Sequence, residues 1–180
     1  MRIAEDLLPY WQRLQERDPQ TIDLVVIHCT ELPDMKMARE FGEKIVYTDS
    51  STGVSGHYYI DRDGSIYRYI PENRIANHVI GHNKHSIGIE LVNLGRYPNW
   101  FVSTSQNPNE PYPSVQIESL KVLLKDLRGR HQNLKNLAGH SDLDTAMIPA
   151  KDDPNILIRR KIDPGPQFPW DEVQQFWEKL

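Results

Sequence analysis

The feature that most constrains this chain is an apolar run near its start that ends in a histidine. Residues 21–28 read Thr-Ile-Asp-Leu-Val-Val-Ile-His. β-Branched residues pack well on a pleated surface, so the run predicts a buried strand. The carboxyl end of such a strand is where a rigid scaffold presents reactive groups. The run therefore predicts a central sheet and makes His28 the first candidate for a functional site.

Three further segments predict strands of the same sheet. Residues 57–70 predict a β-hairpin, because the Asp-Gly pair within them is a favoured two-residue turn. Residues 86–92 alternate in a strand-like pattern, and residues 134–138 predict a short strand that ends just before His140. The hairpin adds antiparallel pairing, so we expect a mixed sheet.

Apolar residues at helical spacing predict four helices. They cover 3–17 within an N-terminal segment 1–20, 33–43, 114–130 with Ser114 as the N-cap, and a last helix from Asp171. Loops are expected at 47–55, 95–113 and 141–160. Because strands and helices are interspersed, the fold class is α/β (mixed), with a single central mixed β-sheet flanked by helices. We expect one domain over residues 1–180.

Composition narrows the possible partners and compartments. The chain has 180 residues, of which 38% are hydrophobic, and no apolar run is long enough to span a membrane. The formal net charge of −4 argues against nucleic acid as a partner. The first residues do not read as a secretory signal, so we expect a cytoplasmic protein, or a periplasmic one whose export signal is missing here. A monomer is the default expectation.

Polar residues at the ends of apolar segments form a candidate metal site. His28 ends its strand, His140 follows Asn-Leu-Ala-Gly, and Asp163 follows Arg-Arg-Lys-Ile. Two imidazoles and one carboxylate suit zinc and leave a fourth position for water. Asp152 and Asp153 are rival candidates for the third ligand.

Five blocks of sequence occur in a characteristic order. They are Val-Val-Ile-His-Cys-Thr (25–30), Ser-Gly-His-Tyr-Tyr-Ile (55–60), Ser-Ile-Gly-Ile-Glu-Leu (86–91), Ala-Gly-His-Ser-Asp (138–142) and Lys-Ile-Asp-Pro-Gly-Pro (161–166). Together they resemble the N-acetylmuramoyl-L-alanine amidase family, the AmpD-like type, whose fold phage amidases and peptidoglycan recognition proteins share. The resemblance implies one Zn²⁺ per chain. It also implies hydrolysis of the amide bond between N-acetylmuramic acid, or its 1,6-anhydro form, and L-alanine in peptidoglycan or muropeptides.

The resemblance also assigns roles to individual residues. His28, His140 and Asp163 match the three metal ligands of the family. Lys161 matches its transition-state lysine, and Glu90 matches the carboxylate proposed as general base. Some relatives place a catalytic tyrosine where this chain has Gly56, which shifts the proton-transfer role onto Glu90.

The remaining histidines and the single cysteine receive more modest expectations. His78 and Asn93 are candidates for substrate binding, and the family has a histidine in the block that contains His78. We expect His57 to be a core or supporting histidine and Cys29 to be a small buried residue. A solvated loop is expected around His82 and His85. His131 is expected at the C-terminal end of a helix, where a positive charge is mildly favourable.

Two questions stay open at this point. Tyr97, Trp100 and Phe101 either stack on a sugar or wall the cleft, or they only pin the long loop to the core. The function has two alternatives to the amidase. One is a non-catalytic module of the same fold that binds muropeptides. The other is a zinc peptidase, for which the sequence has no H-E-x-x-H helix.

Overall fold

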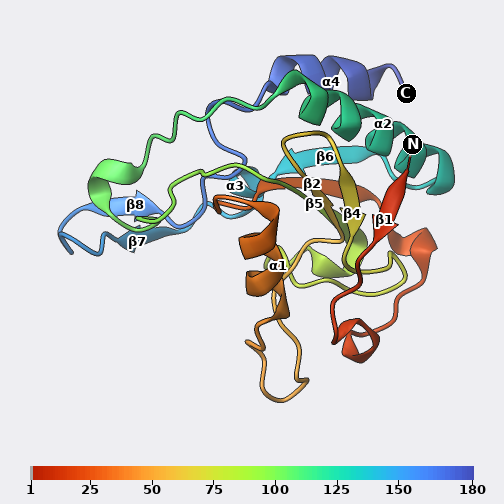
Figure 1. The fold of residues 1–180 in the computed structure, drawn as a ribbon, viewed down its shortest axis with the longest axis horizontal. Helices are drawn as coiled ribbons and strands as arrows, with labels where there is room; N and C mark the ends of the chain where they lie inside the picture. Colours follow the sequence, from red (N-terminus) through yellow and green to blue (C-terminus); the bar gives the residue numbers. More distant parts are fainter. Residues whose placement is uncertain (1) are drawn as a thin grey trace.

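A computed structural model describes residues 2–180 of the chain. Within them, six strands form one mixed sheet in the spatial order β1-β4-β3-β5-β2-β6 (Figure 1). The strands are Ile3–Glu5 (β1), Leu24–Cys29 (β2), Tyr58–Ile60 (β3), Ile66–Arg68 (β4), Ser86–Leu91 (β5) and Asn136–Gly139 (β6). β2 pairs in parallel with β5 and β6, whereas β3 and β4 pair antiparallel. The mixed sheet and the hairpin predicted from the sequence are confirmed.

Helices cover both faces of this sheet (Figure 1). They are Met35–Glu43 (α1), Ser114–Arg130 (α2), His140–Leu143 (α3) and Trp170–Glu178 (α4), with short 3₁₀ turns at Trp11–Arg13, Pro19–Thr21, Asn83–His85 and Ser103–Ser105. Among residues 2–180, no helix combines the length and the apolar character needed to cross a membrane.

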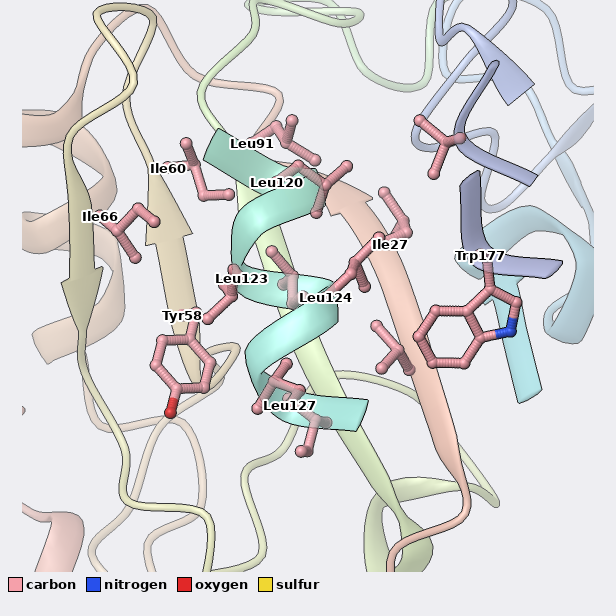
Figure 2. Packing of buried hydrophobic residues seen from close by; sticks show 14 of the residues in the cluster. Ile27, Tyr58, Ile60, Ile66, Leu91, Leu120, Leu123, Leu124, Leu127 and Trp177 are labelled. Atoms are coloured by element: carbon pink, nitrogen blue, oxygen red, sulfur yellow. The ribbon is translucent and has the colours of Figure 1, made fainter. Parts of the chain in front are cut away.

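Alternate residues of β2 point to opposite faces of the sheet, as the two-residue period of a strand requires. Val25 and Ile27 belong to the main apolar cluster, which also contains the buried side of α2 and Trp177 of α4. Figure 2 shows Leu120, Leu124 and Ile27 interdigitating between the helix and the sheet. Burying each such side chain contributes about 1.5–3 kcal/mol. This face holds β2 in place, so the other face is free to carry polar groups.

The N-terminal segment differs from the predicted helix. Residues 3–5 form β1, which pairs in parallel with β4, and the Leu8 amide continues this contact by donating to the Tyr69 carbonyl. Pro9 has no N–H and interrupts helical hydrogen bonding. Leu8 and Leu14 are still buried, in a second apolar cluster. The apolar residues were identified correctly, but tertiary strand pairing overrides their helical spacing.

Two smaller expectations were also wrong. Ser114 begins α2, but it is not its N-cap, which is Pro113, and no side chain caps this end. The expected loop over 141–160 contains most of α3 and an antiparallel hairpin of Met147–Pro149 (β7) and Leu157–Arg159 (β8). The strand expected over 134–138 is confirmed as β6, which begins two residues later and ends at Gly139. Pairing with β2, which lies far away in the sequence, sets the bounds of β6.

Candidate metal centre

Three segments that lie far apart in the sequence bring His28, His140 and Asp163 together. His28 lies on β2, His140 is the first residue of α3, and Asp163 lies in the segment before α4. His28 Nδ1 is 3.0 Å from His140 Nδ1 and 3.0 Å from Asp163 Oδ2, and His140 Nδ1 is 3.1 Å from the same oxygen. The Ser141 amide donates to the Asp163 carbonyl. This hydrogen bond links the segment that carries His140 to the segment that carries Asp163. The three residues predicted as ligands therefore form one buried cluster.

The chemistry of this cluster fits a bound cation. Three atoms held at about 2 Å from one zinc ion lie roughly 3 Å from one another, as the three ligand atoms here do. Asp163 Oδ1 is buried and has no hydrogen-bond partner, which is costly for a carboxylate oxygen unless a cation or donor reaches it. Asp152 and Asp153 lie outside the cluster and accept hydrogen bonds from Ser103 and Asn155. Asp163 is therefore the third member of the cluster, and neither rival candidate belongs to it.

A chain of hydrogen bonds fixes which nitrogen of His28 faces the cluster. The Ser86 hydroxyl donates to the His82 carbonyl (2.8 Å), so toward His78 it accepts, and His78 Nε2 carries the proton (3.1 Å). Neutral His78 then accepts at Nδ1 from His28 Nε2 (3.0 Å). His28 Nδ1 is left with its lone pair directed at His140 and Asp163. The positions of the ring protons follow from this chain of hydrogen bonds. They give His28 the tautomer that a metal ligand needs.

The electrostatics of the cluster favour a neutral His28 and an ionised Asp163. Burial lowers the pKa of His28 to about 4, although Asp163 opposes the shift. Burial also lowers the pKa of His78, and the neighbouring His28 adds to this effect. For Asp163, burial alone would raise the pKa, but the neighbouring His140 and His28 hold it well below its usual range. A neutral imidazole and an ionised carboxylate are the protonation states that metal binding requires.

Glu90 and Lys161 line the same cavity as the triad, and its volume is about 260 Å³. Glu90 lies on β5 beside His28, with its Oε1 4.0 Å from His28 Nδ1. Burial raises the pKa of Glu90 to about 8, the Asp163 charge adds to the rise, and Lys161 opposes it. A side chain at Gly56 would come within 2.9 Å of Glu90 Cγ. The glycine found in place of the tyrosine of some relatives therefore leaves room for this carboxylate.

The two candidates for substrate binding occupy different places. His78 lines the cavity, but protein partners occupy both of its ring nitrogens. Its ring lies so close to Gly88 that a Cβ there would sit 2.6 Å from Nδ1. Asn93 does not line the cavity, and its amide donates to the Glu110 carbonyl while its oxygen accepts from the Gly95 amide. His78 is therefore placed to orient His28, and a role in substrate binding stays a prediction for both His78 and Asn93.

The other singled-out residues are structural. His57 is fully buried, bonded to Arg17 and to the Gly88 amide, as expected of a core histidine. Cys29 is a buried free thiol. Two further histidines have carboxylate partners. His85 contacts Asp23, and His131 contacts Glu72.

Sequence reasoning did not identify Ser86 or the buried pair of Glu31 and Arg96. Ser86 opens the block Ser-Ile-Gly-Ile-Glu-Leu, which was the only available signal for it. Arg96 contacts Glu31 at 2.6 Å and donates to the carbonyls of Arg159 and Arg160, just before Lys161. An Arg–Glu pair so distant in the sequence has no local signature.

Known proteins are similar to this chain in both sequence and fold. AmiD of Escherichia coli (strain K12), an N-acetylmuramoyl-L-alanine amidase, is 30% identical over 170 residues, which cover 86% of this chain and 52% of AmiD. The structure of E. coli AmiD in complex with the substrate anhydro-N-acetylmuramic acid-L-Ala-D-γ-Glu-L-Lys superposes with a TM-score of 0.65 at 27% identity, covering 87% of this chain and 57% of that chain. The amidase LysC from Clostridium intestinale URNW has the same fold, with a TM-score of 0.68 at 24% identity and coverage of 97% and 96%.

The family assignment rests on a match along most of the chain. The chain spans about half the length of the curated relatives it matches. The model of the family described as N-acetylmuramoyl-L-alanine amidase matches residues 18–166, a range that includes all three residues of the buried triad together with Glu90 and Lys161. The expected fold and the expected relationship are thus confirmed, and the chain belongs to the N-acetylmuramoyl-L-alanine amidase family.

Proposed function

We propose that this chain is a zinc-dependent amidase that hydrolyses the bond between N-acetylmuramic acid, or its 1,6-anhydro form, and L-alanine in muropeptides. The observation that carries the proposal is the buried triad of His28, His140 and Asp163, with its unpartnered carboxylate oxygen, in a cavity that also contains Glu90 and Lys161. The anhydro-muramoyl peptide bound to the related AmiD supports the substrate class.

The triad would hold one zinc ion through the two Nδ1 atoms and the Asp163 carboxylate. When bound, zinc supplies a water of lowered pKa and a Lewis acid for a carbonyl group. The residues around it determine what that chemistry achieves. His78 and Ser86 keep the His28 lone pair directed at the ion, and the apolar face of β2 fixes the strand that carries it.

Glu90 would act as general base toward the attacking water and then as general acid toward the leaving amine. Its carboxyl borders the triad, and its pKa of about 8 is suited to proton exchange near neutral pH. Glu90→Gln keeps the shape but removes the exchangeable carboxyl proton. We expect kcat to fall by about 10²- to 10⁴-fold with zinc content unchanged. Full activity in this variant would exclude the assigned role.

Lys161 would stabilise the negative charge that develops on the carbonyl oxygen during attack. Its side chain lines the cavity together with the triad, and it lies two residues before Asp163. A fixed ammonium in a partly desolvated site stabilises such charge far better than it would in water. The Arg96 guanidinium holds the carbonyls of the two preceding residues, which positions this segment.

The decisive experiment is hydrolysis of a purified anhydro-muropeptide by the full chain. It is measured on the protein as isolated, after removal of metal with a chelator, and after zinc is added back. We expect release of free peptide that stops on chelation and returns with zinc. No release by protein that contains one zinc per chain would instead indicate a muropeptide-binding module. Cleavage of the free peptide without the sugar would indicate a peptidase. The cytoplasmic location stays a prediction, which fractionation of the host cell tests.

A further inference from the structure

Lys161 and Asp163 lie in a segment that neither a strand nor a helix holds in place. The segment runs between the end of β8 at Arg159 and the start of α4 at Trp170. Reacting groups must be held within about 0.5 Å of their productive geometry, and a misplacement of about 1 Å can cost roughly 10²-fold in rate. Side chains from elsewhere in the fold must therefore fix this segment.

Arg96, near the start of the loop of residues 95–113, holds the segment at its upstream end. Its guanidinium is buried and has five N–H donors. The acceptors are the Arg159 carbonyl (3.2 Å), the Arg160 carbonyl (3.2 Å), the Gln106 side chain (3.1 Å) and both carboxylate oxygens of Glu31 (2.6 and 2.9 Å). Every hydrogen that this guanidinium can donate is therefore used. A lysine, with three donors, cannot make the same set of contacts.

The contact with Glu31 connects this end of the segment to the strand that carries His28. Glu31 lies three residues after His28, and its backbone carbonyl accepts from Trp100 Nε1 at 3.0 Å. It has a left-handed backbone conformation, with φ of 50°, which is uncommon for a residue other than glycine and persists only where surrounding contacts enforce it. Arg96 therefore fixes the end of β2 relative to the residues just before Lys161.

Tyr112, near the other end of the same loop, holds the segment just after Asp163. Its hydroxyl donates to the Pro164 carbonyl at 2.6 Å, and its ring packs edge to face against Phe168 with centroids 5.4 Å apart. The Asp163 carbonyl, one residue earlier, accepts from the Ser141 amide at 2.9 Å. Two consecutive carbonyls are thus bound, which restrains the backbone that carries the Asp163 carboxylate.

The sheet anchors the loop close to Tyr112. Glu110 forms a two-point contact with Arg62, in the turn between β3 and β4, at 2.7 and 3.1 Å. The Glu110 carbonyl also accepts from the Asn93 side chain, just after β5, at 3.2 Å. Arg96 and Tyr112 therefore reach the segment from a loop that is itself held to the sheet.

We propose that the loop of residues 95–113 is a two-point brace, in which Arg96 positions Lys161 and Tyr112 positions Asp163. This inference rests on the proposed function, in which Lys161 stabilises developing charge and Asp163 is a metal ligand. Neither Arg96 nor Tyr112 lines the central cavity, so both act through another residue. Loss of the Arg96 contacts should therefore lower kcat, whereas loss of the Tyr112 hydroxyl should weaken zinc binding.

Arg96→Lys tests the first point, because it keeps a buried positive charge beside Glu31 but not the five hydrogen bonds. We expect kcat toward an anhydro-muropeptide to fall about 10- to 100-fold. KM and zinc content should stay at the wild-type values, since Lys161 acts on charge that develops only in the transition state. In a Lys161→Met background the same change should cost less than about twofold, because the residue that Arg96 positions is gone.

Two further variants support this test. Arg128→Lys, near the C-terminal end of α2, is the matched control and should keep the wild-type kcat. Gln106→Ala removes one acceptor of the Arg96 guanidinium and leaves the buried pair intact, so it replaces Arg96→Lys if that variant does not fold. It should cause a smaller loss of kcat that also disappears in the Lys161→Met background.

Tyr112→Phe tests the second point and keeps the ring that packs against Phe168. We expect zinc affinity to fall about tenfold, measured by competition with a chromophoric chelator. The kcat of the zinc-saturated protein should stay within about twofold of wild type. Tyr67→Phe is the matched control, because Tyr67 lies on β4, is also partly buried and does not line the central cavity. Its zinc affinity should equal that of wild type.

The outcomes separate the brace from the proposed function. If Arg96→Lys loses as much activity in the Lys161→Met background as in wild type, Arg96 does not act through Lys161, and the brace is overturned while the amidase proposal stands. Equal zinc affinity in Tyr112→Phe and wild type overturns the brace as well. If zinc-loaded wild type does not cleave the muropeptide, the amidase proposal fails. The zinc affinity of Tyr112→Phe then decides the brace: a tenfold loss supports it, and an equal affinity overturns it.

Discussion

Alternate residues of β2 face two very different environments. Val25 and Ile27 lie in an apolar cluster against α2 and α4, whereas His28 points to the opposite face, toward His78 and the carboxylate of Asp163. Burying apolar side chains stabilises the fold, but burying a carboxylate and imidazoles costs free energy unless they are paired or bind a metal. The comparison teaches that the apolar face supplies the stability that allows the polar face to hold its groups ready for a ligand.

The largest expected effect comes from the polar face. Asp163→Asn removes the charged member of the triad, so we expect zinc content to fall from one per chain to near zero. Amidase activity should fall by at least about 10³-fold. The free energy of unfolding of the metal-free protein should fall, because the folded state stabilises the ionised Asp163 carboxylate. Elemental analysis, muropeptide hydrolysis and urea denaturation measure the three quantities. A variant that keeps its zinc would refute the assignment of Asp163.

The apolar face should respond in the opposite way. Leu124→Ala truncates a fully buried side chain of α2, and we expect the free energy of unfolding to fall by about 2–5 kcal/mol. The kcat/KM of the folded protein should be retained, since α2 lies on the face away from the triad. Val122→Ala on the exposed side of the same helix should change stability by less than about 0.5 kcal/mol. A selective loss of activity by folded Leu124→Ala would show that the two faces are coupled.

A buried ionic cluster away from the metal centre gives a pH-dependent contribution to stability. Glu72 contacts Arg130 and His131. Burial would raise its pKa, but hydrogen bonds from His131, Arg130 and Tyr58 hold it well below the ordinary value of 4.5. The stabilisation is therefore present above about pH 4.5, and it is lost as the pH falls toward the pKa of the folded state.

Glu72→Gln tests this contribution in the metal-free protein, so that loss of zinc in acid does not interfere. We expect the variant to be less stable than wild type by about 3 kcal/mol at pH 7. The difference should shrink below about pH 4.5. Glu118→Gln is the control, because Glu118 is 65% exposed and its contact with Lys121 is a surface pair. A difference between wild type and Glu72→Gln that stays constant with pH would contradict the assignment.

The two faces also differ in how far the sequence predicts them. β2, β5 and α2 were predicted closely because each has a strong periodic pattern in its own residues. The triad was found because its members end apolar segments and match motifs of a family. The helix predicted over residues 3–17 was wrong at its start, where the structure has β1. The apolar spacing there suits a helix equally well, and only pairing with β4 decides between the two.

Contacts between residues that lie far apart in the chain could not be predicted from the sequence. The hydrogen bonds that join Ser86, His78 and His28 depend on where three separate segments meet, and no local pattern encodes them. The same holds for Glu31 and Arg96, which are 65 positions apart. The open question about Trp100 and Phe101 also needed the structure, which shows that they line a cavity beside Lys161.

The smallest expected effect concerns the tautomer of His28. Ser86→Ala removes the acceptor that fixes the proton on His78 Nε2, so His78 can carry it on Nδ1 instead, facing His28. His28 would then be protonated at Nδ1, the atom that faces the triad. We expect zinc affinity to fall about tenfold, measured by competition with a chromophoric chelator.

Nitrogen NMR of the metal-free protein should show the change of tautomer at His78 and His28, which a general loss of stability does not produce. Ser103→Ala removes a serine hydroxyl that donates to the exposed Asp152, and it should leave both readouts at the wild-type value. Unchanged tautomers in Ser86→Ala would show that Ser86 does not set the orientation of the polar face. The neighbouring strands and the ring contact with Gly88 would then be enough to hold His78 and His28 in place.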